Sequence, residues 1–206
     1  MTRFLGNRSR RCSTPCIRAV VLWLTARLPC RIISGPNGEP YLERYFLFRA
    51  IGVTACIHRF VADDPDRGLH DHPWGWAASL VLVGGYYEQR LISVPAGRVL
   101  PFRADRPDTH NPNPIIVHTR FLWPGRFNFL RGDDFHRGTL RCGRAEAWTV
   151  FVHGPRRKGW GFVKYIPTAS GHNFQRYEPF ALTREGAFDR WWETAPSGQE
   201  QRRKAA

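Results

Sequence analysis

Short apolar runs divided by turn-forming residues constrain the fold of this chain more than any other feature. The segments YLERYFLFR at 41–49 and VTACIHRFV at 53–61 are rich in β-branched and aromatic residues. Clusters of turn-forming residues bound them, namely SGPNGEP at 34–40 and ADDPDRG at 62–68. Similar runs continue to residue 167, and short strands at close intervals are typical of a β-sandwich or barrel. The sequence therefore predicts an all-β fold.

The same pattern divides the chain of 206 residues into three regions, which are 1–40, 41–167 and 168–206. In the first region we expect a basic arm followed by one helix over 15–30. The second region is the predicted barrel, interrupted by a proline-rich insertion at 103–119. The third region is predicted to hold one short helix at 183–195, followed by a charged tail.

The chain is strongly basic, with 31 lysines and arginines against 17 acidic residues and a net charge of +14. Such a charge suits acidic partners, including nucleic acid, anionic lipid or a phosphorylated small molecule. Nearly all of the basic residues are arginines, however, and they are scattered, with the densest clusters at the termini. A compositional origin of the charge therefore stands beside a functional one, which disfavours a nucleic-acid partner without excluding it.

The cysteines and the apolar runs indicate the compartment. The five cysteines are an odd number at irregular spacing, which argues against a secreted disulfide framework. The longest apolar run near the N-terminus, AVVLWLTA at 19–26, is far shorter than the ~20 residues of a membrane span. We therefore expect reduced thiols, no membrane association and a cytoplasmic protein.

The tripeptide His70-Asp71-His72 is the strongest chemical signal in the chain. Side chains alternate between the two faces of a strand, so a strand here would point both histidines one way and Asp71 the other. The two imidazoles could then bind one metal ion, and imidazole suits zinc, copper, iron and nickel. An isolated HxH is more often a pair of ordinary surface or core histidines, so a metal site needs a further ligand.

His136 is the predicted third ligand. The turn Pro124-Gly125 begins a strand, Gly132 makes the next tight turn, and His136 follows at the start of another strand. This layout, together with an HxH that leads to the Gly84-Gly85 turn, resembles the two motifs of the cupin superfamily over roughly residues 53–165. The resemblance implies a double-stranded β-helix, or jelly-roll, barrel that binds a metal.

The metal of that family is held by the two histidines of the HxH, a glutamate a few residues on and a histidine of the second motif. In this chain the glutamate would fall near Ala77, where the sequence GWAAS has no carboxylate. Two alternatives follow. A three-histidine site, as in the thiol dioxygenases of the family, leaves room for substrate and dioxygen. Otherwise Glu88 reaches in from the next strand as a ligand or as a general base.

Four further side chains are predicted to line a substrate pocket, which are Trp74, Trp76, Tyr86 and Arg90. The two tryptophans flank the HxH, and structural packing at the barrel mouth explains them equally well. Tyr86 and Arg90 alternate with Glu88, so the three would share the inner face. Candidate anion clamps are Arg59, Arg67, Arg137 and the run Arg156-Arg157-Lys158, while His58 is expected in the core and His153 at the rim.

The resemblance also gives the expected activity. The stretches HRFVADDPDRGLHDHPW, GGYYE and HGPRRKGWGF look like small uncharacterised cupin-like proteins of bacteria and phages. We expect one divalent transition metal, with iron favoured and zinc, manganese or nickel as alternatives. The expected chemistry is dioxygenase-like or isomerase-like, on a small polar or anionic molecule. The alternatives are a non-catalytic small-molecule-binding cupin module and an arginine-rich nucleic-acid-associated protein, and a homodimer is a possible assembly.

Overall fold

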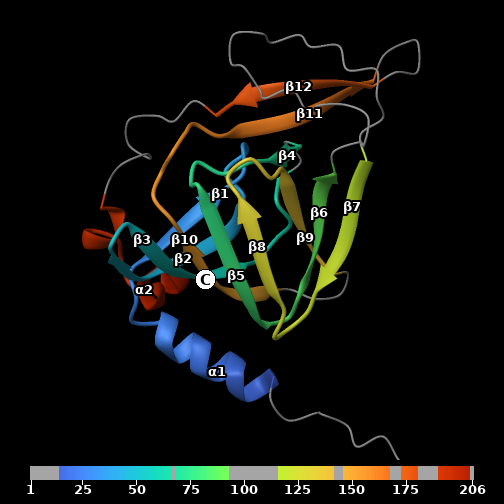
Figure 1. Cartoon of the computed structure of the whole chain (residues 1–206). Coiled ribbons are helices and arrows are strands. Elements are labelled where there is room, and N and C mark those ends of the chain that lie inside the picture. The colour runs from blue at the N-terminus through green and yellow to red at the C-terminus, as the bar shows by residue number, and fades with distance from the viewer. Residues whose placement is uncertain are drawn as a thin grey trace, which may run out of the picture.

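The computed structural model describes residues 14–65, 68–92, 116–141, 146–167, 173–180 and 190–204 (Figure 1). Its helical elements are α1 (Thr14–Thr25), the 3-10 helix η1 (Trp191–Glu193) and α2 (Gly198–Lys204). Its strands are β1 (Cys30–Ser34), β2 (Pro40–Ala50), β3 (Val53–Phe60), β4 (Leu69–His70), β5 (Trp76–Val83), β6 (Tyr86–Ile92), β7 (Ile116–Leu122), β8 (Phe127–Arg131), β9 (His136–Leu140), β10 (Ala147–His153), β11 (Gly161–Pro167) and β12 (Asn173–Pro179). None of the described helices is long and apolar enough to cross a membrane.

The strands form two six-stranded antiparallel sheets. The first sheet has the order β1-β2-β3-β10-β5-β8 and the second has the order β12-β11-β4-β9-β6-β7. The eight strands from β3 to β10 pair like one long folded hairpin, β3 with β10, β4 with β9, β5 with β8 and β6 with β7. Successive pairs alternate between the sheets, which is the topology of a jelly roll. The predicted all-β fold class is confirmed: the strands form a double-stranded β-helix, or jelly roll, with an N-terminal and a short C-terminal helix.

Apolar clusters pack outside the first sheet, between the two sheets and on the second sheet. α1 packs beside β5 and lies along one side of the molecule (Figure 1). The cluster beneath it comprises Val21, Cys30, Tyr45, Ile57, Val83 and Trp148. Between the sheets, a second cluster of Val81, Tyr86, Leu122 and Ala147 fills the end near the β5–β6 turn. Toward the opposite end, where β4 leads into β5, a further cluster of Ala77, Leu130 and Phe151 packs with Trp74, and the ring of His72 lies 6.3 Å from that of Phe151.

The predicted Gly84-Gly85 turn is confirmed, and it joins β5 of the first sheet to β6 of the second. Both glycines have a positive φ, 79° at Gly84 and 127° at Gly85. Side chains are disfavoured in that region, and a Cβ at Gly84 would approach the carbonyl oxygen of Glu146 to 2.3 Å. The chain can therefore cross between the sheets here only with glycine.

The N-terminal helix is shorter than the predicted 15–30, because α1 ends at Thr25. Pro29 disfavours helix in the residue before it, and a turn leads from α1 into β1 (Cys30–Ser34). β1 pairs with β2, so the first sheet begins before the predicted barrel range of 41–167, and β12 extends the second sheet beyond it. The division into three regions stays a prediction. Of the insertion at 103–119, residues 103–115 lie outside the described part, and residues 116–119 belong to β7.

The C-terminal helix lies later in the chain than predicted. Residues 181–189 are outside the described part, and the rest of the predicted 183–195 contains the single turn η1. α2 follows in the segment that was expected to be a charged tail. The amide of Glu200 donates to the hydroxyl of Ser197, and the Glu200 carboxylate accepts from the amide of Ser197. This reciprocal pair is a capping box, which explains why the helix begins here.

Candidate metal centre

The HxH segment lies at the end of β4 in the second sheet. β4 pairs with β9, where His70 is directly opposite His136, and with β11, where His70 is opposite Phe162. The prediction that all of the HxH lies in a strand is wrong, because β4 ends at His70. The chain leaves the strand since the amide of His72 donates to the carbonyl of Gly132, at 3.2 Å. A Cβ at Gly132 would lie 2.2 Å from the carbonyl oxygen of Trp74, so this close approach requires glycine.

Asp71 points away from its two neighbours, as alternation predicts. Its side chain is buried, with one oxygen accepting from the amide of Gly161 at 2.7 Å and the other from Nζ of Lys158 at 2.6 Å. Lys158 also pairs with the exposed Asp133. These contacts hold the segment between β4 and β5 against the start of β11, and they fix the backbone from which His70 and His72 project.

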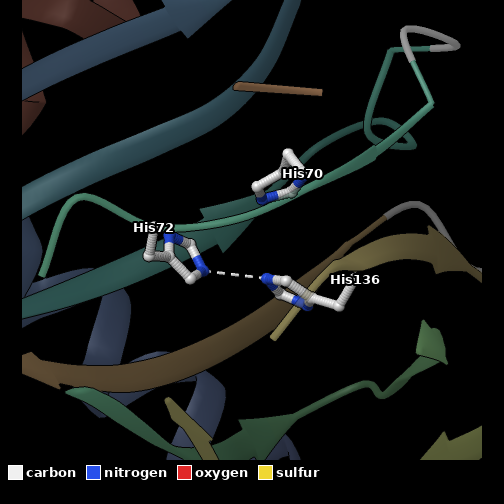
Figure 2. A group of neighbouring side chains, drawn as sticks. All are labelled: His70, His72 and His136. Carbon is white, nitrogen blue, oxygen red and sulfur yellow. Dashed lines mark hydrogen bonds between the residues drawn. The ribbon is translucent and has the colours of Figure 1, made fainter. Parts of the chain in front are cut away.

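The three predicted histidines come together. Their ligand nitrogens lie within 4.8 Å of one another, and His70, His72 and His136 are the only such metal-ligating group among the described residues. The Nε2 atoms of His72 and His136 are 2.8 Å apart and point at each other (Figure 2). We refer to these residues as the histidine triad. Two of its members come from paired strands and the third from the chain that leads to β5.

The donor set of the triad fits a transition metal. Burial, and then the neighbouring His136, His70 and Arg44, hold the pKa of His72 well below its ordinary value, so this imidazole is neutral and offers a lone pair. Metal–nitrogen bonds of about 2.1 Å place ligand nitrogens on one ion roughly 3 to 4 Å apart. The separations within the triad are compatible with that requirement after small side-chain rotations.

Glu88 does not join the triad; it lies on the far side of His136. Its fully buried carboxylate is 3.3 Å from Nδ1 of His136, accepts from Asn128 at 2.7 Å and pairs with Arg120 at 2.7 Å and Arg90 at 3.3 Å. Burial alone would raise the pKa of Glu88, but His136, Arg90 and Asn128 outweigh it and lower the pKa to about 2. An ionised carboxylate therefore faces Nδ1 of His136, while Nε2 of the same ring faces the triad.

Tyr86 and Arg90 share the inner face of β6 with Glu88, as expected from the alternation. Tyr86 is buried in the apolar cluster at the far end, with its ring 5.4 Å from that of Phe60. One terminal nitrogen of Arg90 donates hydrogen bonds to Asn128, to the carbonyl of Phe129 and to Glu88. The structure thus places Tyr86 in the core and Arg90 in the network around Glu88.

The two predicted pocket tryptophans line one surface cavity, but only Trp74 also contacts the triad. The ring of Trp74 stacks on His72, with centroids 5.1 Å apart, and on His153, at 3.9 Å, so it forms a wall beside the triad. Trp76 neighbours the buried Ala77 on β5 and projects from the opposite face of the first sheet, where its indole covers Gly154. The structure brings Trp74 to the triad and leaves Trp76 outside.

One side chain of the site had no signal in the sequence. Arg44 lies on β2 directly opposite His58 on β3, and its Nε donates to Nε2 of His58 at 2.9 Å. His58 is the expected core histidine, stacked on Phe151 at 4.5 Å. Burial first, and then the charge of Arg44, holds the pKa of His58 well below its ordinary value. Only the pairing of β2 with β3 reveals this arrangement, because neither residue carries a local motif.

Two of the anion clamps proposed from the sequence form ion pairs within the protein. Arg59 pairs with Glu43 and Glu146, and Lys158 pairs with Asp71 and Asp133. Arg137 follows His136 on β9, so it projects from the other face of the strand. Arg67 lies outside the described residues.

No protein-family model and no curated protein matches this chain. Among solved structures, it is similar to hydroxypropylphosphonic acid epoxidase from S. wedmorenis (18% identity, 60% of this chain and 55% of that chain, TM-score 0.39). It is also similar to Fe(II) HppE in complex with substrate (18%, 61% and 56%, TM-score 0.43) and to oxalate oxidase in complex with the substrate analogue glycolate (17%, 63% and 59%, TM-score 0.42). The chain spans less than two-thirds of each, and at these low TM-scores the jelly-roll assignment rests on its own strand pairing.

Proposed function

We propose that this protein is a metal-binding enzyme of cupin type. It holds one divalent transition metal through His70, His72 and His136 and acts on a small polar or anionic molecule. The observation that carries the proposal is the convergence of three ligand nitrogens, from two paired strands and an adjoining turn, within 4.8 Å. Three protein ligands are the number found in catalytic sites that keep a coordination position open, whereas structural zinc sites are closed by four.

The three imidazole donors limit which metals the site can bind, but they do not select one metal. Three imidazoles suit iron, zinc, copper and nickel. We favour iron, with zinc, manganese or nickel as alternatives, and a dioxygenase-like or isomerase-like reaction. A bound ion would supply a Lewis acid with free coordination positions. A three-histidine set without a carboxylate keeps the positive charge of that ion, which favours an anionic substrate.

Glu88 acts in this proposal as a positioning residue for His136, in place of the ligand or general base expected from the sequence. The Glu88 carboxylate lies 3.3 Å from Nδ1 of His136. A carboxylate in that place favours the tautomer that keeps the proton on Nδ1 and the lone pair on Nε2. The contacts of Glu88 with Arg120, Arg90 and Asn128 support this role, because they hold the carboxylate in one orientation. Trp74 supplies the apolar wall that limits water beside His72.

The proposal is tested by metal content. Protein purified without a histidine tag is loaded with a divalent metal, and its metal content is measured by inductively coupled plasma mass spectrometry. The variants His70→Ala, His136→Ala and His118→Ala are treated in the same way. We expect about one equivalent of metal per chain in the wild type and almost none in His70→Ala and His136→Ala. His118 is exposed on β7, so His118→Ala should keep about one equivalent. Circular dichroism confirms that each variant is folded. Wild-type protein that refuses added metal would refute the proposed function.

A further inference from the structure

Among the described residues Arg44 has no acidic partner, which distinguishes it from three other arginines of the two sheets. Arg59, Arg90 and Arg120 each contact a glutamate. Within the described part of the chain, the only hydrogen bond of Arg44 runs from Nε to His58, and no carboxylate forms an ion pair with it. Burial lowers the pKa of this guanidinium, which shows that its charge is held in an unfavourable environment.

Arg44 lies close to the triad, on the side where Trp74 stacks on His72, and its charge acts on the His72 imidazole. Its Cζ lies 5.9 Å from the centroid of Trp74, the same ring that stacks on His72. The bond to His58 fixes one edge of the guanidinium and leaves both terminal nitrogens without a partner in the described chain. Neither nitrogen is among the described atoms that are both fully buried and without a hydrogen-bond partner.

Among the described residues, the side chains beside Arg44 and Trp74 add no unbalanced negative charge. His153 stacks on Trp74, and its pKa falls to about 4, mainly through burial and against the effect of its bond to the carbonyl of Gly154. It is therefore neutral at physiological pH. The charge of Glu88, on the opposite side of His136, is balanced by Arg90 and Arg120. The net charge beside the triad is positive even before a metal ion is added.

We propose that Arg44 binds an oxyanion group, a carboxylate or a phosphorus oxyanion, of the small molecule that reaches the histidine triad. The inference deepens the proposed function and rests on it for the role of the triad. A guanidinium presents its donors as a planar fork that matches two oxygens of such a group. The bound anion offsets the charge of Arg44, and its other end can approach His72 past Trp74. His58 is a positioning residue that orients the fork.

The test uses three probes that each carry one methyl group: acetate, methylphosphonate and acetamide. Titration of each into zinc-loaded full-length protein is followed by saturation-transfer difference NMR, since zinc has no redox chemistry. We expect acetate, methylphosphonate or both to bind and the neutral acetamide not to bind. The tighter of the two anions identifies the oxyanion class.

Two substitutions assign the binding to Arg44. Loss of a charge-assisted hydrogen bond in Arg44→Gln is expected to weaken anion binding by about tenfold to a hundredfold, with zinc content unchanged. Arg126→Gln is the matched control, because Arg126 is exposed and also stacks on a tryptophan, Trp123. It should bind like the wild type. Equal affinity in Arg44→Gln, or a zinc-loaded wild type that binds neither anion, would overturn the proposal.

Two further measurements test the inference if Arg44→Gln does not fold or if the protein takes up no metal. If Arg44→Gln does not fold, the wild type is modified with phenylglyoxal in the presence and absence of acetate. We expect acetate to protect Arg44 from modification, which mass spectrometry of the Arg44 peptide measures. An unprotected Arg44 argues against binding there. The titration is also repeated on metal-free protein. A chain that takes up no metal but binds acetate through Arg44 refutes only the proposed function, whereas a loaded chain that ignores both anions refutes only this inference.

Discussion

Two arginine-containing clusters flank the histidine triad, and they differ in how their charge is balanced. Around Glu88, two guanidiniums and one amide satisfy a single buried carboxylate. Around Arg44, one guanidinium faces a neutral histidine and an indole. The first cluster has its charges paired within the protein and so serves to hold His136. In the second, Arg44 has no acidic partner among the described residues, so it is suited to bind an anion from outside the protein.

The largest expected effect follows from removing Glu88. In Glu88→Ala, Arg90, Arg120 and Asn128 lose their common acceptor, and breaking a buried ion pair in this way destabilises a fold by about 3 to 5 kcal/mol. Urea unfolding of the metal-free protein measures this loss. Glu88→Gln keeps the shape and should lose less stability, while its zinc affinity falls by roughly tenfold to a hundredfold because His136 is oriented less firmly. Unchanged zinc affinity in Glu88→Gln would show that Glu88 does not position His136.

A smaller effect is expected at the other cluster on acidification. The pKa of His153 is lowered from 6.5 to about 4, chiefly by burial, so the folded protein holds this ring neutral while the unfolded chain protonates it. Stability from this group is therefore complete above pH 6.5 and is lost as the pH falls toward 4, by about 3 kcal/mol. His153→Gln should show a shallower decline of unfolding free energy over this range. His118→Gln, changed at an exposed site, should decline like the wild type. Identical slopes in all three proteins would show that His153 is not held neutral.

The smallest effect concerns the contact that ties the HxH segment to β11. Lys158→Met removes one partner of the buried Asp71 but leaves the bond from the amide of Gly161, so we expect a loss of about 1 to 2 kcal/mol. Asp133→Asn removes only the exposed partner of Lys158 and should change the unfolding free energy by less than ~0.5 kcal/mol. Thermal or urea unfolding of the two variants compares them. Equal losses would mean that Asp71 does not depend on Lys158.

The strands and the triad were predictable because their signals are local. The alternation of apolar residues and the glycine turns mark β2, β3, β5, β6 and β10 closely. His70 and His72 are neighbours in the sequence, and His136 follows a recognisable turn. The short helix α2 could also have been found, since Ser197 and Glu200 have the spacing of a capping box.

The remaining features depend on pairing between distant segments. The role of Arg44 depends on the strand register that sets it opposite His58. The role of Glu88 depends on its contacts with Asn128 and Arg120, which lie on two other strands. Alternation correctly predicted the inner face of β6 for Tyr86, Glu88 and Arg90. It could not show that Tyr86 lies at the apolar end of that face and Glu88 behind His136.

The central claim, that the histidine triad binds a metal, is tested most directly by X-ray absorption spectroscopy of the zinc-loaded protein. The account predicts three imidazole nitrogens at about 2.0 Å from zinc in the wild type and in His118→Ala, and two in His72→Ala. Sulfur ligands at about 2.3 Å, or a His72→Ala spectrum identical to that of the wild type, would place the metal elsewhere and contradict the account.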